Sequence, residues 1–580
     1  MKRMLSRAAA AALAAIVAIH AQPQTARAAD YYFSGDGTTG GSGTPADPYR
    51  TLAPINGIDL NPGDKVFLSG NFPAPTGGIE LTAEDAGTAG NPVSFIGVGL
   101  SRPTINAGDS FGFRATDAGG IDLKNINFIG NGPASRVTDP ASPNLGLFTN
   151  NEDGVRFFTS QGDKKDHIRV DNVYVRGFGD NGIKVGAEVG ASGFNDVRIT
   201  NSIVEKNQHA GVNFEGDYNQ ANRSAHTNVL ISNVRALDTT GRANRPNQGN
   251  TGSGIVIGQV NGGVIQYSVA KNNGKECASL AGGPVGIWAW DSNNVKIQYN
   301  EAFNNGTAGH HDGGGFDLDG GVTNSVMQYN YSHNNEGAGF LLAQFEGAKQ
   351  FTGNVIRFNI SQADGRKNGY GGIHAFGPIE DTKVYNNTIL MTPAAKDQAG
   401  TRNEAPAAVR FRDGSTKEID FYNNLFIVQG ADGNASLFSP AMLNLAGADE
   451  QTFLNNDYWQ LGGLGAFVNP ADPNSMNLDP LLLDLGNGGT FDDIENYRLA
   501  ELLEYQLDDS SPLIDGGVNL AALFGIDVGL QDFYGNGPHG EGWDIGAHES
   551  LVGGPFVPEP AGAVLMSLAM TGLLRRRRRI

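Results

Sequence analysis

The chain has 580 residues, and its 41 lysines and arginines against 61 aspartates and glutamates leave a formal net charge of −20. Because phosphate backbones are bound by clustered basic side chains, this balance argues against nucleic acid as a partner. The single cysteine excludes an internal disulfide, so the fold depends on packing and backbone hydrogen bonds, for which a hydrophobic content of 39% is sufficient.

The N-terminus has the three parts of a secretory leader. Basic residues are followed by an apolar run over Ala8–Ile19 and then by Ala26-Arg27-Ala28, which has small residues at the two positions that a signal peptidase reads. Residues 1–28 are therefore predicted to be a signal peptide that a signal peptidase removes during export.

Short β-branched and aromatic segments recur through the middle of the chain at a spacing of about 30 residues. Each is followed by a second apolar segment, and eight of these begin at Gly182, Gly211, Gly254, Gly286, Gly315, Gly339, Gly372 and Ala408. Short strands with glycine and asparagine at the corners are typical of a parallel β-helix, whose coils bury their apolar sides by stacking on one another. We predict an all-β solenoid over residues 29–440. We also predict a structural ladder formed by Asn201, Asn233, Asn300, Asn330, Asn359, Asn386 and Asn423.

The two ends of this body carry further motifs. The opening, with Tyr31-Tyr32-Phe33 and Asn61-Pro62-Gly63-Asp64, resembles the first coil of the pectate-lyase-like right-handed β-helix superfamily. The closing motifs over 477–480, 511–517 and 544–549 resemble a subgroup of surface proteins described as having a choice of anchors, although His548 stands where an aromatic residue is commoner. The resemblance implies a right-handed helix whose closing coils occupy residues 441–550. It leaves the chemistry open, because the superfamily includes lyases, hydrolases, epimerases and non-catalytic adhesins.

After a linker at 551–556, residues 557–580 combine three ordered features. Pro558-Glu559-Pro560 precedes the apolar stretch Ala561–Leu574, which is followed by Arg575–Arg579. This order resembles the PEP-CTERM sorting tail of Gram-negative bacteria. The resemblance implies transient membrane insertion, cleavage by an exosortase, and delivery to the cell envelope, the cell surface or the extracellular matrix. A plain C-terminal membrane anchor is the alternative.

Alternate residues of a strand face opposite ways, so the residues between the buried positions of the second segments should form columns outside the coil, with about 4.8 Å between coils. The first column reads Lys184, Asn213, Val256, Trp288, Asp317, Leu341, His374 and Arg410. The second reads Gly186, Glu215, Gly258, Trp290, Asp319, Ala343, Phe376 and Arg412. Exposed tryptophans beside aspartates predict a carbohydrate-binding cleft, because aromatic rings stack on sugars and carboxyl groups supply acid/base catalysis.

Asp317 and Asp319 are the candidate catalytic pair. Strand rise places them about 6.5–7 Å apart, near the lower limit for inverting glycosidases, and their repulsion raises one of the two pKa values. Glu336 is the candidate third carboxylate, and Asp312 is an alternative. The candidate substrate-binding residues are Trp288, Trp290, His374, Phe376, Arg410, Arg412, Lys184 and Glu215. A second interpretation is a Ca²⁺ site at the Asp-x-Asp pair, with Asp312 as a further metal ligand.

Three functions fit this pattern, and we expect a monomer in each case. We favour a secreted glycoside hydrolase that acts on a polysaccharide. A calcium-dependent polysaccharide lyase is the alternative, but the outward bases His374 and Arg410 are two and three coils away from the aspartates. The third candidate is a non-catalytic matrix or adhesion protein, in which the solenoid itself is the functional structure.

Overall fold

The structure is a computed structural model, which describes residues 28–35, 40–73, 77–132, 148–160, 162–188, 192–218, 224–243, 250–448, 450–490, 502–540 and 542–552. The predicted sorting tail and all but the last residue of the predicted signal peptide lie outside the described residues. Within these ranges, no helix is both long enough and apolar enough to cross a membrane.

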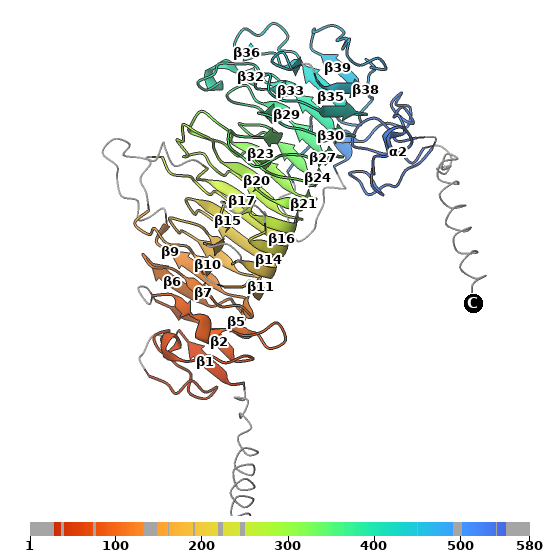
Figure 1. Cartoon of the computed structure of the whole chain (residues 1–580). Helices are drawn as coiled ribbons and strands as arrows, with labels where there is room; N and C mark the ends of the chain where they lie inside the picture. Colours follow the sequence, from red (N-terminus) through yellow and green to blue (C-terminus); the bar gives the residue numbers. More distant parts are fainter. Residues whose placement is uncertain are drawn as a thin grey trace, which may run out of the picture.

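The chain winds into a right-handed parallel β-helix of about 12 turns, as predicted (Figure 1). The second segments form a twelve-stranded parallel sheet. Its strands are β4 (Ile79–Leu81), β7 (Phe113–Thr116), β10 (Val155–Thr159), β13 (Ile183–Ala187), β15 (Ala210–Glu215), β17 (Ser253–Gly258), β20 (Val285–Trp290), β23 (Gly314–Asp319), β26 (Phe340–Ala343), β29 (Gly371–Phe376), β33 (Ala407–Phe411) and β37 (Ala441–Asn444).

The other strands form a 25-stranded sheet that bends into two parallel columns. The first column contains β1 (Asp30–Ser34), β2 (Lys65–Ser69), β5 (Val93–Gly97), β8 (Ile121–Lys124), β11 (Lys165–Asp171), β14 (Phe194–Glu205), β16 (His226–Leu237), β18 (Val260–Gln266), β21 (Asn293–Gln298), β24 (Val326–Gln328), β27 (Asn354–Arg357), β30 (Thr382–Tyr385), β34 (Ile419–Tyr422) and β38 (Thr452–Leu454). The second column contains β3 (Asn71–Phe72), β6 (Thr104–Gly108), β9 (Asn127–Gly130), β12 (Tyr174–Arg176), β19 (Val269–Lys271), β22 (Glu301–Phe303), β25 (Tyr331–His333), β28 (Ile360–Gln362), β31 (Thr388–Met391), β35 (Leu425–Gln429) and β39 (Asp457–Leu461), while β14 and β16 are long enough to span both.

The remaining elements are short and lie outside these sheets. They are the antiparallel pair β32 (Ala394–Ala395) and β36 (Leu437–Phe438), the 3-10 turns Ile55–Gly57, Ala83–Asp85, Lys396–Gln398 and Leu503–Tyr505, and the helix α2 (Leu520–Phe524).

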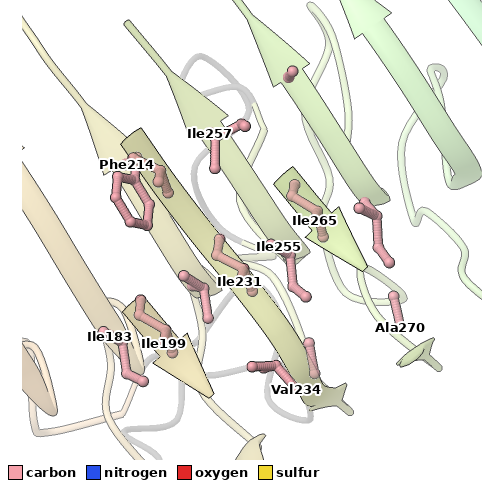
Figure 2. Packing of buried hydrophobic residues seen from close by; sticks show 14 of the residues in the cluster. Ile183, Ile199, Phe214, Ile231, Val234, Ile255, Ile257, Ile265 and Ala270 are labelled. Carbon is pink, nitrogen blue, oxygen red and sulfur yellow. The ribbon is translucent and has the colours of Figure 1, made fainter. Parts of the chain in front are cut away.

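Rows of aliphatic and aromatic side chains fill the interior of the coils (Figure 2). Ile183 pairs with Val212, and Val212 pairs with Ile255, so that equivalent positions stack directly from coil to coil. Ile199 and Ile231 face them from the other sheet, and all of these side chains are buried. Each coil therefore depends on its neighbours for burial, as expected for a solenoid.

The predicted asparagine ladder is present, but it divides into two columns. In the interior, each asparagine donates its backbone N–H and its side-chain amide to the Oδ1 atom of the next, from Asn300 through Asn330 and Asn359 to Asn387. The remaining predicted positions, Asn201, Asn233, Asn386 and Asn423, have positive φ and lie at the corners of the coils.

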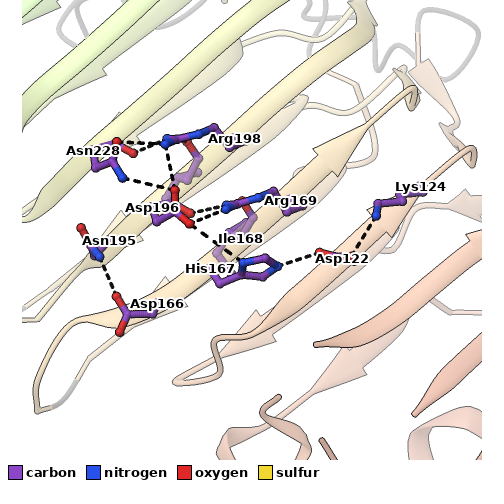
Figure 3. A network of polar contacts seen from close by, with 11 residues as sticks. Asp122, Lys124, Asp166, His167, Ile168, Arg169, Asn195, Asp196, Arg198 and Asn228 are labelled. Atoms are coloured by element: carbon purple, nitrogen blue, oxygen red, sulfur yellow. Dashed lines mark hydrogen bonds and ion pairs between the residues drawn. The ribbon is translucent and has the colours of Figure 1, made fainter. Parts of the chain in front are cut away.

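A second, charged ladder ties consecutive coils of the N-terminal half at an outer corner (Figure 3). His167, Asp196 and Asn228 occupy equivalent left-handed positions, with φ of 64°, 59° and 54°. His167 Nε2 lies 2.9 Å from Asp122 Oδ1, and Asn228 Nδ2 donates to Asp196 Oδ1 at 3.2 Å. The charged side chains of this ladder bind to other side chains of the protein, so the corner has a structural role.

The segment that we expect to form closing coils begins as coils and ends differently. Residues 441–461 do stack, because β37, β38 and β39 form the last turn. After β39, Met476 still makes a parallel bridge with Asp457. The described residues of 502–552, which we call the C-terminal cap, add no strand to the stack and fold back along the flank beside β24, β27 and β30 (Figure 1). There the hydroxyl of Tyr329 donates to the carbonyl oxygen of Gln531 at 2.9 Å.

Candidate active site

The predicted outward columns are present on the twelve-stranded sheet. β20 and β23 pair so that Trp288 lies beside Asp317 and Trp290 lies beside Asp319. β26 then places Leu341 beside Asp317, and β29 and β33 continue the column. Alternation therefore predicted the register, whereas the segments that cover each column decide what its residues can contact.

A pocket of about 280 Å³ opens in front of β15, β17, β20 and β23. It is lined by the apolar residues Ala210 and Val256, by the aromatic residues Trp288, Trp290 and Phe345, and by the polar residues His209, Asn213, Glu215, Asn250 and Asp319. The pocket thus combines aromatic rings with carboxyl groups, the combination that the outward columns predict.

Three carboxyl groups at this site influence one another's ionisation. Burial, and then the charges of Asp319 and Asp312, raise the pKa of Asp317 well above its usual value. Burial also raises the pKa of Asp319 to about 7, although the backbone N–H of Gly320 donates to its Oδ1 at 2.6 Å and favours the charged form. Because like charges this close do not all ionise together, the group retains at least one proton near neutral pH.

Asp317 and Asp319 differ in their access to the pocket. Asp317 is 3% exposed, and its Oδ1 is buried without a hydrogen-bond partner. Asp319 is partly exposed and lines the pocket. A buried polar atom without a partner costs about 1–3 kcal/mol and is rare in folded proteins. The unpaired Oδ1 atom of Asp317 therefore lowers the free energy of unfolding at this site.

Asp312 joins this group through Tyr370. The hydroxyl of Tyr370 accepts a hydrogen bond from the backbone N–H of Asp312 at 2.8 Å and donates one to Asp312 Oδ1 at 3.2 Å. Desolvation raises the pKa of Asp312, while the charge of His311 and the hydrogen bond from Tyr370 favour its ionised form. Tyr370 is buried, and its ring lies 4.6 Å from the ring of His374.

The sequence pattern also suggests Ca²⁺ ligands among these aspartates. Over the described ranges, no group of three or more His, Cys, Asp or Glu side chains is arranged to hold a metal ion. Calcium binding at Asp312, Asp317 and Asp319 stays a prediction from the sequence.

Trp288 is not the exposed stacking platform that its outward position predicts. It is 5% exposed, packs against Val256 and Val285, and donates from Nε1 to Ser253 Oγ at 3.1 Å. It therefore forms part of the pocket floor, and Trp290 is the partly exposed tryptophan of the pair. The expected exposure of Trp288 was wrong, because strand alternation shows that a side chain points out of the coil but not whether other residues cover it. Trp288 still lines the pocket, and its contact with substrate stays a prediction.

The basic residues farther along the columns are also covered. Arg410 Nη1 and Arg412 Nη1 donate to Glu404 Oε2 at 2.6 and 3.0 Å. His374 is buried, and burial together with Arg412 and Arg410 lowers its pKa well below the usual value, so the ring is neutral. None of these three residues lines the pocket, and neither does the exposed Phe376. Arg410, Arg412 and His374 thus have protein partners, whereas Phe376 is exposed outside the pocket, and substrate contacts of these four residues stay a prediction.

Lys184, Glu215 and Glu336 have separate positions. Lys184 Nζ pairs with Glu215 Oε1 at 2.7 Å, and of the two only Glu215 lines the pocket. Glu336 Oε2 accepts from the backbone N–H of Thr307 at 2.9 Å and lies 3.5 Å from Lys367 Nζ. Glu336 therefore fastens the turn before β23, and Asp312 is the third carboxyl group that interacts with the aspartate pair.

Sequence reasoning missed three aromatic residues at the site. Phe345 lines the pocket and continues the alternation of Leu341 and Ala343 by one more step, so a longer column would have included it. Tyr370 lies four residues before His374, on the same outward alternation. Tyr218 follows β15 on an irregular turn, and no sequence signal points to it.

The fold and the pocket define a right-handed parallel β-helix protein with an aspartate group beside aromatic rings. Residues 154–389 match the family described as the right-handed β-helix region. Lacto-N-biosidase of Bifidobacterium longum subsp. longum is 24% identical over 91% of this chain, which spans 37% of that protein's length. A solved lacto-N-biosidase from Eubacterium ramulus has 16% identity and a TM-score of 0.44, covering 67% of this chain and 68% of that chain. A pectate lyase has 15% identity and a TM-score of 0.38, covering 91% of this chain and 97% of that chain.

Proposed function

We propose that the protein is a glycoside hydrolase that cleaves its substrate at Asp319 with a second aspartate as partner. The observation that carries this proposal is a carboxyl group with a pKa of about 7 in an aromatic-lined pocket. A group with this pKa holds a proton near neutral pH and can transfer it to the oxygen of a leaving sugar.

The partner is Asp317 or Asp312. Besides burial, the charge of Asp312 raises the pKa of Asp319, and the charges of Asp319 and Asp312 raise the pKa of Asp317. Asp317 lies two residues from Asp319 on the same side of β23, and its Oδ1 has no hydrogen-bond partner. Asp312 accepts a hydrogen bond from Tyr370, which favours the carboxylate that a general base or nucleophile requires. We retain Asp317 as the first candidate, and the variants Asp317→Asn and Asp312→Asn test which of the two aspartates is the partner.

The charges around the pocket favour a neutral sugar over a uronate, and hydrolysis over elimination. A lyase needs a cation to neutralise the uronate carboxylate and a base to remove the proton. Lys184 is paired with Glu215 at 2.7 Å, and Lys349 is paired with Asp291 at 2.6 Å. The carboxylate of Glu215 lines the pocket and would repel a uronate.

The sequence match supports a carbohydrate substrate. It extends over 91% of this chain and leads to a protein named lacto-N-biosidase. Because this chain spans only 37% of that protein, the substrate and the linkage require a direct test.

The test is incubation of the purified protein with neutral and acidic oligosaccharides, measuring both new reducing ends and the absorbance of unsaturated uronate. We expect reducing ends from a neutral glycan, no unsaturated product, and no loss of activity in EDTA. Asp319→Asn should abolish cleavage, and Asp317→Asn and Asp312→Asn identify the partner. The matched control is Asp381→Asn, because Asp381 is exposed and pairs with Lys383 outside the pocket.

Each contrary result selects another function. Unsaturated uronate that disappears with EDTA would indicate the calcium-dependent lyase. Binding without cleavage of any glycan would indicate the matrix or adhesion protein. If all three aspartate variants still cleave the glycan, the protein is a hydrolase but these aspartates are not its catalytic residues.

From the leader and tail motifs, we also propose export, signal-peptidase cleavage, exosortase cleavage at Pro558-Glu559-Pro560 and delivery to the cell surface of a Gram-negative bacterium. The measurement is the mass of the mature protein from the envelope and medium of the native host. Retention of residues 557–580 would instead support the plain membrane anchor.

A further inference from the structure

A strap formed by residues 344–350 crosses the turn that follows Asp319. The strap leaves β26, and its Phe345 ring packs over Gly320, where an added Cβ atom would collide with the ring. Gln344 Nε2 donates to the carbonyl oxygen of Lys349 at 2.8 Å, and the backbone N–H of Gly321 donates to Gln344 Oε1 at 3.0 Å. The strap is thus closed on itself and bonded to the coil of β23.

The other end of the strap is fastened to the coil of β20. Lys349 Nζ lies 2.6 Å from Asp291 Oδ2, and the Asp291 side chain is fully buried. Breaking such a pair leaves an uncompensated buried charge, so it holds its partners more firmly than a surface pair does. Phe345 is therefore kept in place beside Asp319 although its own side chain is 38% exposed.

Tyr218, from the segment after β15, packs beside Trp290 and Phe345. Its ring centroid lies 5.8 Å from that of Trp290 and 6.4 Å from that of Phe345. Lys349 Nζ lies 4.9 Å from the ring centroid of Tyr218, whose hydroxyl donates to the carbonyl oxygen of Gly347 at 3.4 Å. Rings from segments that follow β15 and β26 thus meet Trp290 at the end of β20.

We infer that Tyr218, Trp290 and Phe345 form an aromatic wall that binds the apolar face of a neutral pyranose ring beside Asp319. The inference rests on the proposed function for the role of Asp319. Aromatic side chains offer a large apolar face with few rotatable bonds, which suits the C–H face of a sugar. The polar residues His209 and Asn213 line the same pocket and provide partners for hydroxyl groups.

The residues on either side of the wall indicate the direction in which the substrate extends. Toward β29, the first-column residues Leu341 and His374 are buried, and so is Tyr370, whose ring packs against His374. Toward β15, the pocket continues to Glu215, which the strand register places three coils from Asp319, or about 14 Å. A short saccharide therefore extends from Asp319 toward β15, the direction in which the pocket continues.

The experiment measures binding separately from cleavage. The full chain carrying Asp319→Asn is titrated with lactose, cellobiose, N,N′-diacetylchitobiose and digalacturonate, and tryptophan fluorescence is recorded. We expect saturable binding of at least one neutral disaccharide and none of digalacturonate. Phe345→Ala and Tyr218→Ala should each raise the dissociation constant about tenfold, as expected for the loss of one ring contact. Lys349→Met, which releases the strap without removing a ring, should raise it in the same direction.

The control is Phe524→Ala, since Phe524 is an exposed aromatic residue on the C-terminal cap, and this variant should bind as the parent does. Thermal unfolding of every variant checks that it is folded. If no neutral disaccharide binds, or if the folded variants at Phe345 and Tyr218 bind as the parent does, the wall is wrong. A larger effect of Phe376→Ala than of Phe345→Ala would overturn the direction.

The two proposals fail separately. Cleavage by the unmodified protein together with unchanged binding by the wall variants contradicts only the wall. Binding that depends on the wall, without any cleavage, contradicts only the hydrolase.

Discussion

Two outward faces of the same solenoid differ in what covers them. On the flank beside β24, β27 and β30, the C-terminal cap covers the coils, and the hydroxyls of Tyr329 and Tyr385 donate to carbonyl oxygens of the cap. On the twelve-stranded sheet, Asp319 borders an open pocket and Asp317 keeps a buried oxygen without a partner. An outward polar residue is thus structural where another segment covers it and supplies its partner, whereas Asp319 is accessible to a ligand because it borders the pocket.

The largest expected effect comes from removing the acid at the open face. Asp319→Asn should lower kcat by a factor of about 10² to 10⁴, the range for loss of a general acid, without unfolding the protein. Steady-state kinetics on the cleaved glycan, with circular dichroism as the folding check, measure this. In the unmodified protein, activity should fall as pH rises through about 7, because Asp319 then loses its proton. A pH profile that is flat between 6 and 8 would contradict this role.

Tyr370→Phe tests whether a buried hydroxyl on the site face acts through Asp312. If Asp312 is the partner of Asp319, the variant should lower kcat about tenfold with little change in KM, because a hydrogen bond to the reacting carboxylate is lost. Because the lost hydrogen bond had lowered the pKa of Asp312, that pKa should rise and the acidic limb of the pH profile should move to higher pH. Tyr385→Phe is the matched control, because its hydroxyl donates to Asp527 in the cap. Equal effects of the two variants would indicate a purely structural role for Tyr370.

Asp319 should contribute more to the stability of the folded protein in acid than in base. Burial raises the pKa of Asp319 from 3.8 to about 7 in the folded state, so the folded state binds this proton more tightly than the unfolded state. The stabilisation is complete below pH 3.8 and is lost as pH rises through about 7. Asp319→Asn cannot ionise, and it should therefore show a smaller loss of unfolding free energy between pH 5 and pH 8. Denaturant unfolding at both pH values measures this, and parallel curves for the two proteins would contradict it.

The smallest effect is expected on the covered flank. Tyr329→Phe removes the hydrogen bond to Gln531 and should lower the free energy of unfolding by about 0.5–1.5 kcal/mol, with unchanged kcat and KM. Chemical denaturation and the glycan assay measure the two properties. A loss of activity would show that the cap and the pocket are coupled.

The repeat could be predicted from the sequence because every coil buries the same apolar strand positions against its neighbours. The alternation in β20 and β23 predicted that Trp288 meets Asp317 and Trp290 meets Asp319, and the strands pair in that register. The asparagine prediction shows the limit of this reading. At the Asn386-Asn387 pair we chose the first residue, whereas the second continues the interior ladder and the first turns at the corner with a φ of 52°. A shift of one residue moves a side chain to the other face of a strand.

The parts of the site that the sequence did not predict come from segments between the strands. Phe345 reaches the pocket because the strap folds back to Asp291, and Asp312 joins the aspartates because Tyr370 approaches from a later coil. Arg410 lies in the predicted column but is engaged by Glu404, which no repeat position encodes. Such contacts depend on where irregular turns lie in space, and the strand period carries no information about them.

The sequence by itself therefore determined the solenoid, its core and the outward position of Asp317 and Asp319, because these follow from strand alternation and from the need of each coil to bury one side. The tertiary structure decided which outward residues remain accessible. It covered Trp288, His374 and Arg410, left Asp319 beside a pocket, and brought Phe345 and Tyr370 to it. The physical reason is that alternation is a local property of a strand, whereas burial of an outward side chain depends on long-range contacts made by the turns.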